Sequence, residues 1–140
     1  MTGEFAIAVH AIVYLNRHEG MFSSEALAQN VCTNPARIRK VMSKLKRAKL
    51  VDAREGAVGG YRFTRDPKET TLLMIFDALD QPMVNTSWRS GDPDMDCMVA
   101  AGMADVMDGI YKDMDVCCRK RLGEISVYDV DCRLTAIAAT

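Results

Sequence analysis

The sequence has no run of apolar residues that approaches the roughly 20 needed to cross a membrane as a helix. Its opening stretch, MTGEFAIAVHAIVYLNRHEG, is apolar, but no basic segment precedes the apolar run and no small-residue cleavage site follows it. We therefore expect neither a membrane span nor a secretory signal peptide, and we expect a cytoplasmic protein.

Cysteine and histidine are too few and too scattered for a conventional site. The five cysteines are an odd number and none has Cys-x-x-Cys spacing, so an extracellular disulfide framework is not expected. The two histidines are far from forming a metal-binding cluster. We expect His10 to face the core or an interface and His18 to lie at the surface near a helix end.

Catalytic motifs are missing as well. The sequence contains no nucleophile elbow, no HExxH motif and no phosphate-binding loop between a strand and a helix. The glycine-rich stretch EGAVGGY, residues 55–61, lacks the Lys-Ser/Thr ending of such a loop and joins two expected strands instead. These absences predict a protein that is not an enzyme.

Charge is strongly separated along the chain, although the net charge is only −1. Residues 33–65 contain ten Lys/Arg and two Asp/Glu, whereas residues 66–140 contain seven and fourteen. This asymmetry predicts that the first of these segments binds a polyanion and that the second does not.

The most basic segment predicts a helix over residues 35–48. Asn34 suits the N-cap and Pro35 the first helical position. Apolar residues recur every three or four positions and predict one buried stripe, made of Ile38, Val41, Met42 and Leu45. The opposite face carries Arg37, Arg39, Lys40, Ser43, Lys44 and Arg47.

Helices are also expected before and after this segment. The first covers residues 4–18, and a short one begins at Glu25 behind a cap from Ser23 or Ser24. Residues 50–54 and 61–65 predict two short strands around a tip that contains Gly56, Gly59 and Gly60. A further helix is expected over residues 71–79.

The second half predicts a loop over residues 81–94 and a long helix over residues 95–122. The apolar stripe of this helix is longer than one small domain can cover, and its members are Val99, Met103, Val106, Ile110 and Met114. A partner's copy could complete that burial, so we expect a dimerisation helix. The tail beyond it is only weakly patterned.

This order of elements describes a mainly α protein with a small β-hairpin wing, that is, a winged helix-turn-helix. We expect a DNA-binding domain over residues 1–80, a linker loop over residues 81–94, and a dimerisation helix with a C-terminal tail over residues 95–140. The basic helix would enter the major groove of double-stranded DNA beside the wing, residues 55–62. A solvated basic face is the common alternative for either feature alone, but the two together favour DNA binding.

The segment SSEALAQNVCTNPARIRKVMSKLKRAKLVDAREGAVGGYRFTRDP, residues 23–67, resembles the Rrf2 (BadM-type) family of bacterial transcription regulators. The family's G-x-x-G-G-Y wing stands here at residues 56–61, and its L-x-x-A/G-x-L-V motif at residues 45–51. The resemblance implies a homodimer with crossing long helices that binds a near-palindromic operator, and we expect a repressor. Glu55 departs from the arginine that many members carry there, and a carboxylate near phosphates is unfavourable, so the operator sequence is not carried over.

By this resemblance, DNA contacts are expected at the start of the basic helix and at Ser43 and Lys44, and the basic face and glycine-tipped hairpin add Arg47 and the wing. The positions are Thr33, Asn34, Ala36, Arg37, Arg39, Lys40, Ser43, Lys44, Arg47, Arg54, Gly59, Gly60, Tyr61 and Arg62. The alternative is a protein-interaction module or co-regulator whose DNA affinity is set by a partner protein. Such a module would show little salt-dependent binding to a duplex.

Relatives that bind an iron–sulfur cluster place three cysteines in the loop before the long helix, because thiolates hold such clusters. This chain has only Cys97 there, so no cofactor is expected. Cys97 remains open as a cluster ligand, a redox-sensing thiol or a small structural residue.

Other residues raise narrower questions. Cys32 is expected in the core, and one of Cys117 and Cys118 is expected to be buried. Trp88 is expected to cover the seam between the long helix and the DNA-binding unit, or else to line a small-molecule pocket. The effector, whether a small molecule or a protein, is not identified by any motif.

Overall fold

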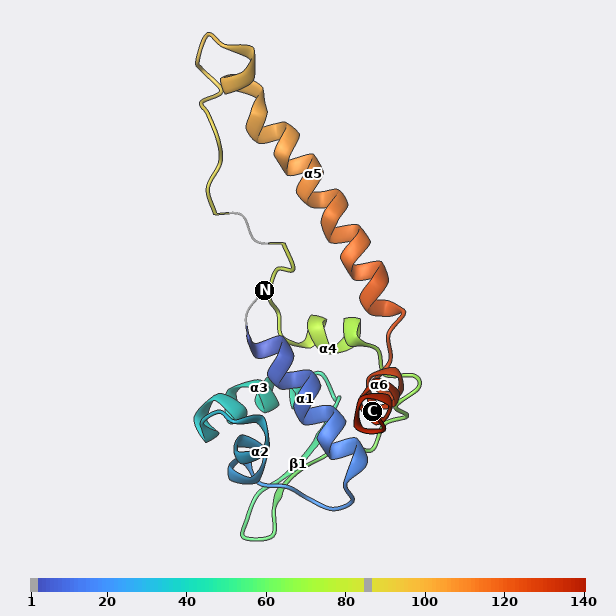
Figure 1. The fold of residues 1–140 in the computed structure, drawn as a ribbon. Coiled ribbons are helices and arrows are strands. Elements are labelled where there is room, and N and C mark those ends of the chain that lie inside the picture. The colour runs from blue at the N-terminus through green and yellow to red at the C-terminus, as the bar shows by residue number, and fades with distance from the viewer. Residues whose placement is uncertain (1–2, 85–86) are drawn as a thin grey trace.

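Helix α1 (Gly3–Arg17) lies at the centre of a helical unit and contacts α2, α3, α4 and α6. One long helix projects from this unit (Figure 1). The computed structural model describes residues 3–84 and 87–140, so positions 85–86 of the expected linker lie outside the described residues. Among the described residues, no helix is long and apolar enough to cross a membrane.

The helix-turn-helix pair follows α1. Helix α2 (Ser24–Val31) begins behind Ser23, whose hydroxyl accepts a hydrogen bond from the backbone N–H of Ala26 at 3.1 Å. Helix α3 (Pro35–Arg47) begins behind Asn34. Both N-caps agree with the sequence-based expectation, because a short polar side chain satisfies an N–H that has no partner within the helix.

The wing is a two-stranded antiparallel hairpin of β1 (Asp52–Arg54) and β2 (Gly60–Arg62). The strands are shorter than the expected 50–54 and 61–65, because the flanking apolar residues Leu50, Val51 and Phe63 turn into the core. Phe22 adds an isolated antiparallel bridge to Tyr61, which extends the sheet towards α2.

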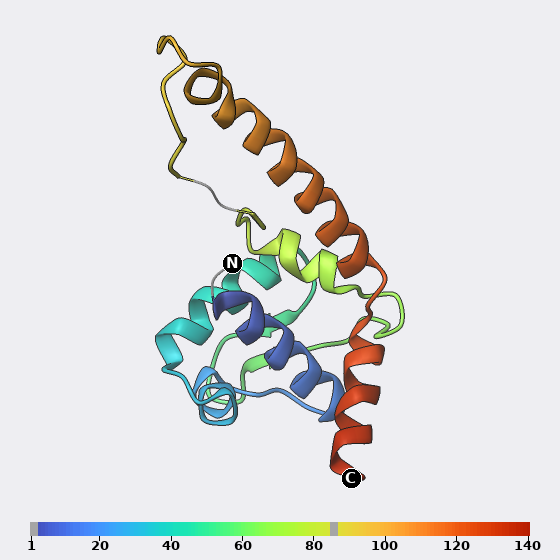
Figure 2. The ribbon, with the colours of Figure 1, turned by 45° about the horizontal axis from the view of Figure 1, so that its top comes forward.

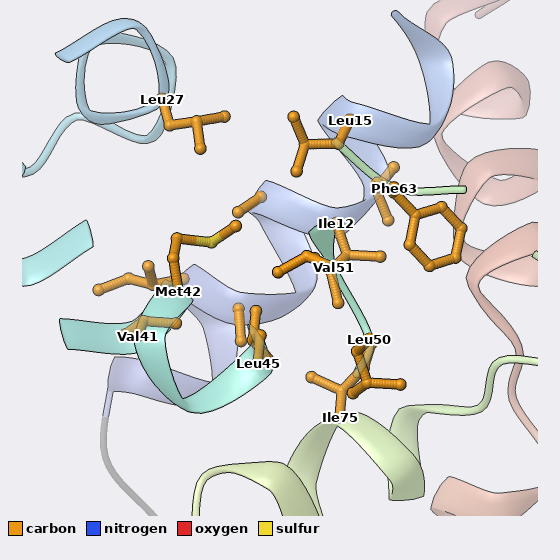
Figure 3. Packing of buried hydrophobic residues seen from close by; sticks show 14 of the residues in the cluster. Ile12, Leu15, Leu27, Val41, Met42, Leu45, Leu50, Val51, Phe63 and Ile75 are labelled. Atoms are coloured by element: carbon orange, nitrogen blue, oxygen red, sulfur yellow. The ribbon is translucent and has the colours of Figure 1, made fainter. Parts of the chain in front are cut away.

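One apolar core joins α1, α2, α3, α4 and the wing base (Figure 3). The predicted stripe of α3 is entirely inside it: Ile38, Val41, Met42 and Leu45 are all 0 % exposed. Ile12 from α1 and Leu27 from α2 meet this stripe in the same cluster. The core therefore fixes which face of α3 remains available to a partner.

Beyond the wing, helix α4 (Leu72–Ala78) is capped by Thr71 and packs against α1, α3 and α5. Helix α5 (Met98–Gly123) starts three positions later than expected because the N-cap Cys97 is extended. None of the residues of α5, all of which are described, is buried. The helix leaves the unit beside α4, where Gly123 lies near Leu73, and projects away from it (Figure 1).

The weakly patterned tail forms helix α6 (Val127–Ala138), which was not predicted from the sequence. The hydroxyl of Ser126 accepts from the Asp129 N–H at 3.0 Å, and the Asp129 carboxylate accepts from the Ser126 N–H at 2.9 Å. This reciprocal capping box starts the helix, and α6 then packs along α1 (Figure 2). The overall class is as predicted: mainly helical, with a small β-hairpin.

Candidate nucleic-acid interface

Helix α3 presents a polar face opposite its buried stripe. Ala36, Lys40, Ser43 and Arg47 recur at helical spacing and all four are exposed. The face contains two cations, one hydroxyl and one small residue that allows close approach. These four predicted contacts therefore share one surface, whose size suits a groove of duplex DNA.

The other predicted residues of α3 lie on its two flanks. On the α2 side, Arg39 Nη1 lies 3.8 Å from Glu25 Oε1, and Arg39 remains half-exposed. On the α1 side, the Arg37 guanidinium lies over Gly3, where an added Cβ would come within 2.8 Å of it. Both arginines lie at the edges of the outer face rather than at its centre.

Glu4, in the first turn of α1, lies between α1 and α3 and is buried. Its Oε1 lies 3.2 Å from Lys40 Nζ and its Oε2 lies 3.1 Å from Lys44 Nζ. Burial opposes ionisation of this carboxyl, but its hydrogen bonds to Lys44 and Lys40 more than offset that effect and lower the pKa of Glu4. No sequence motif signals this cluster, because its members are distant along the chain.

Lys44 differs from the other predicted contacts in its surroundings. Its Nζ donates to Glu4 and to the backbone carbonyl of Leu79 at 3.3 Å, and its side chain is 23 % exposed. The ammonium is therefore directed towards α1 and the end of α4. Its assignment as a DNA contact stays a prediction, and the structure gives it a second role in holding α3.

The wing glycines are required by the fold itself. At Gly59, a Cβ would lie 2.1 Å from the carbonyl oxygen of Arg54, and the Gly59 N–H donates to Gly56 O at 3.1 Å. At Gly60, where φ is +141°, a Cβ would lie 2.4 Å from the carbonyl oxygen of Phe22. The Gly59 N–H is thus already paired within the tip, whereas Gly56 faces open space.

A groove of about 430 Å³ separates α3 from the wing. Ser43 and Lys46 line it from α3, and Arg54, Glu55 and Tyr61 line it from the wing. Glu55 therefore shares the lining of this groove with the cations Lys46 and Arg54. Lys46 was not predicted as a contact, although its place in the basic helix was a usable signal.

The remaining predicted contacts lie around this surface. Asn34 Oδ1 accepts the Arg37 N–H at 2.8 Å, so its oxygen is engaged in capping. Tyr61 is half-buried, with its backbone bonded to Phe22. Arg62 Nε lies 3.5 Å from the cross-strand carboxylate of Asp52. Thr33 is half-buried in the turn before α3.

The cysteines do not fit an iron–sulfur cluster. Within the part of the chain that the structure describes, no group of three or more Cys, His, Asp or Glu side chains is placed to hold a metal ion. Cys97 is an exposed N-cap, and the other cysteines lie on α5, on α6 and at the end of α2. A cluster held by thiolates would need several of them together.

Three narrower expectations of burial are corrected. Cys32 is exposed rather than buried, because it occupies the left-handed C-cap of α2 at φ 64°. Cys117 and Cys118 are both exposed on α5, so neither is buried. His10 is exposed at the surface of α1, where Nε2 lies 2.7 Å from Asn30 Oδ1.

Trp88 does not cover the expected seam. It is 79 % exposed and lies beside the first half of α5, with Arg89, Met103 and Tyr111, around a hollow of about 230 Å³.

A larger groove of about 550 Å³ lies between α1 and α6. Its lining is mostly apolar, with Phe5, Val9 and Leu134 among the residues.

Comparison with known proteins agrees with this architecture. Residues 1–132 match the Rrf2 family, which is described as iron-dependent transcriptional regulators. The candidate HTH-type transcriptional regulator YwnA of Bacillus subtilis (strain 168) is 27 % identical over 130 residues, which cover 93 % of this chain and 96 % of YwnA.

Two crystal structures are similar in fold. A candidate transcriptional regulator from Lactobacillus plantarum is 25 % identical, with a TM-score of 0.85, over 96 % of this chain and 91 % of its own. CymR, the global cysteine regulator of B. subtilis, is 17 % identical, with a TM-score of 0.68, over 95 % of this chain and 96 % of its own. The basic helix, its wing and these likenesses lead to one conclusion: the chain belongs to the Rrf2 family, whose members are transcriptional regulators and not enzymes.

Proposed function

We propose that this chain is a DNA-binding repressor that acts as a homodimer on a near-palindromic operator. The observation that carries the proposal is the outer face of α3, where Lys40, Ser43 and Arg47 are exposed together beside a wing. Each protomer would place this face in the major groove of one half-site, with the wing on the neighbouring backbone. Occupation of the operator would then exclude the transcription machinery from the promoter.

The proposed contacts fall into three groups by position. The centre of the face would meet bases and phosphates through Ala36, Lys40, Ser43 and Arg47. The edges and the preceding turn would add Thr33, Asn34, Arg37, Arg39 and Lys44. The wing would contribute Arg54, Gly59, Gly60, Tyr61 and Arg62. Phosphate contacts give affinity and register, whereas sequence is read at base edges.

Helix α5 supports the homodimer. Its apolar stripe is exposed along most of its length, and the members are Val99, Met103, Val106, Ile110 and Met114. A helix of 26 residues is about 39 Å long at 1.5 Å per residue. Two such helices would cover each other's stripes.

Charge favours an antiparallel pair. The start of α5 follows an acidic loop that carries Asp92, Asp94 and Asp96, whereas its last turn carries Lys120 and Arg121. In a parallel pair, like charges would meet at each end. In an antiparallel pair, the acidic end of one protomer would meet the basic end of its partner, which is the complementary arrangement.

Two metal or cofactor questions follow from the family. An iron–sulfur cluster would require several thiolates together, and the cysteines of this chain are dispersed. We therefore propose regulation without a resident cluster. A redox role for the exposed Cys97 thiol, and a small-molecule or protein effector, are compatible with the same DNA-binding face.

Binding to a duplex from the protein's own promoter region, measured across a range of salt concentrations, tests the proposal. A regulator that releases counterions from several phosphates should lose affinity steeply as salt rises, with a slope of about −0.9 per phosphate in log K against log salt. Binding that hardly changes with salt would instead support a protein-interaction module. Derepression of a reporter on deletion of the gene would support the repressor assignment, and loss of expression would indicate an activator.

A further inference from the structure

Two lysines of the recognition helix share one buried carboxylate. The Glu4 side chain is 8 % exposed, and its two oxygens lie within 3.2 Å of Lys40 Nζ and Lys44 Nζ. The side-chain amide of Gln81, the first residue of the linker, donates to Glu4 Oε2 as well. The carboxylate thus joins α1, α3 and the linker.

The two lysines are held to different degrees. Lys44 is 23 % exposed and has a second acceptor in the Leu79 carbonyl, so its ammonium is committed to the interior side of α3. Lys40 is 67 % exposed on the outer face and pairs with Glu4. Its ammonium is therefore shared between Glu4 and any phosphate that approaches the outer face, and the charge of Glu4 competes with that phosphate.

We propose that Glu4 is a specificity-determining residue, which limits how much positive charge α3 offers to the DNA backbone. The inference rests on the proposed DNA-binding function of α3. Contacts between lysines and phosphates are independent of sequence and supply most of the non-specific affinity. By retaining Lys44 and competing for Lys40, Glu4 lowers binding to arbitrary duplex while leaving base contacts from the outer face in place.

The linker takes part in the same arrangement. Gln81 follows Asp80, which has a left-handed backbone with φ of 53°, and this turn brings the amide of Gln81 to Glu4. The orientation of the Glu4 carboxylate therefore depends on the start of the segment that leads to α5. Glu4 acts through the lysines and is a positioning residue rather than a DNA contact.

The Glu4→Gln substitution tests the inference, because it keeps the size and hydrogen-bonding capacity of the side chain but removes its charge. Affinity is measured against salt for a short duplex of mixed sequence unrelated to the promoter. We expect the slope of log K against log salt to steepen by about 0.9 for each lysine released, which is about a threefold difference per lysine over a fourfold change in salt. The ratio of specific to non-specific affinity should fall.

A double substitution identifies the released lysine. Lys40→Gln should flatten the slope more in the Glu4→Gln background than in the wild type, because only there is Lys40 fully available. If Glu4→Gln leaves both the slope and the specificity ratio unchanged in a folded dimer, the inference is overturned. If the wild type itself shows no salt-dependent binding, the proposed function fails first, so the two failures are distinguishable.

Removal of the Glu4 charge could also unfold the region around Lys44. Comparing the single variant Lys44→Met with the double variant Glu4→Gln/Lys44→Met avoids this problem. In both variants an apolar methionine replaces Lys44, which is the less exposed of the two lysines. Comparison of their salt slopes isolates Lys40 alone, and a steeper slope by about 0.9 in the double variant is expected. Equal slopes in two proteins with equal melting temperatures would contradict the inference.

Discussion

Phe22 and Tyr61 exchange two backbone hydrogen bonds, with N···O distances of 3.0 and 2.8 Å. This bridge ties the second strand of the wing to the residue just before the cap of α2. The wing is therefore not a free hairpin but part of the frame that supports the helix-turn-helix. Its orientation relative to α3 is fixed by backbone contacts rather than by its tip.

Substitution of Gly60 by alanine should destabilise this junction. A Cβ would meet the Phe22 carbonyl oxygen at 2.4 Å, and the φ of +141° is strained for any L side chain. We expect a loss of about 1–3 kcal/mol in the free energy of unfolding, measured by urea denaturation. Gly102→Ala, in open space on α5, is the control and should stabilise by about 0.5–1 kcal/mol. Equal stability of the Gly60→Ala variant and the wild type would contradict the bridge.

Arg39→Ala tests sequence reading at the edge of the outer face. If Arg39 reads a base edge, its loss should cost about 1–3 kcal/mol of binding and relax specificity at one operator position. The measurement is binding to a set of single-base operator variants. Arg133, exposed on α6, provides the matched Arg→Ala control and should leave binding unchanged. Uniform weakening across all sequences would show that Arg39 contacts a phosphate instead.

The dimer should depend on the stripe of α5 and not on its other faces. Val106→Asp places a charge within the apolar stripe, where burial by a partner would be costly, and should shift the protein to a monomer in sedimentation equilibrium. Val116→Asp is the same change on another face of the same helix, and should leave the dimer intact. Dissociation by both variants would indicate that another surface holds the dimer.

Stability should decline in acid in part through Glu4. The pKa of Glu4 is lowered from its ordinary value of 4.5, so folding favours the ionised form. The contribution of Glu4 to the free energy of unfolding is fully present when the pH is above its ordinary pKa. That contribution is lost as the pH falls through the lower pKa of the folded state. Asp129, whose pKa is lowered by hydrogen bonds from Ser126, acts in the same direction. Urea unfolding at descending pH should therefore show a smaller acid loss for Glu4→Gln than for the wild type, and equal losses would contradict this role.

Anaerobically purified protein should be colourless and contain no stoichiometric iron or sulfide. The physical reason is the dispersion of the thiols, with Cys97 alone at the start of α5. An absorption spectrum, together with iron and sulfide analysis, tests for a bound cluster. Colour together with stoichiometric iron would make Cys97 a ligand. A colourless protein whose DNA binding changes reversibly with oxidation would indicate a thiol switch, to be located by single Cys→Ser variants.

Local signals in the sequence were sufficient for the fold of the DNA-binding unit. The caps Ser23 and Asn34, Pro35 and the apolar spacing of α3 all act within a few residues of the element that they define. Such short-range chemistry is readable without knowledge of the rest of the chain. Helix α6 was missed although Ser126 and Asp129 form a capping box, because its apolar pattern is weak.

Local sequence signals could not predict the features that depend on contacts between residues far apart along the chain. Glu4 reads as a first-turn acid, and nothing near it along the chain indicates Lys40 or Lys44. Gly60 was read as a flexible tip residue, whereas its requirement comes from Phe22 in another segment. His10 was expected to face the core or an interface, and its exposed position contradicts the first alternative, because the rotation of α1 against the core decides which of its residues are buried. Tertiary contacts, rather than local pattern, decide such positions.

The backbone bridge between Thr71 and Ser126 has an architectural consequence. It joins the residue before α4 to the residue before α6, so the segment that ends with α5 starts and returns at the same edge of the unit, while α4 itself packs against α1 and α3. The first and last helices, α1 and α6, pack together on the unit itself. The segment that carries α5, the proposed dimerisation helix, is thus closed at its base. In the proposed dimer, a change in the length of this segment would alter the spacing between the two DNA-binding units and leave the fold of each unit intact.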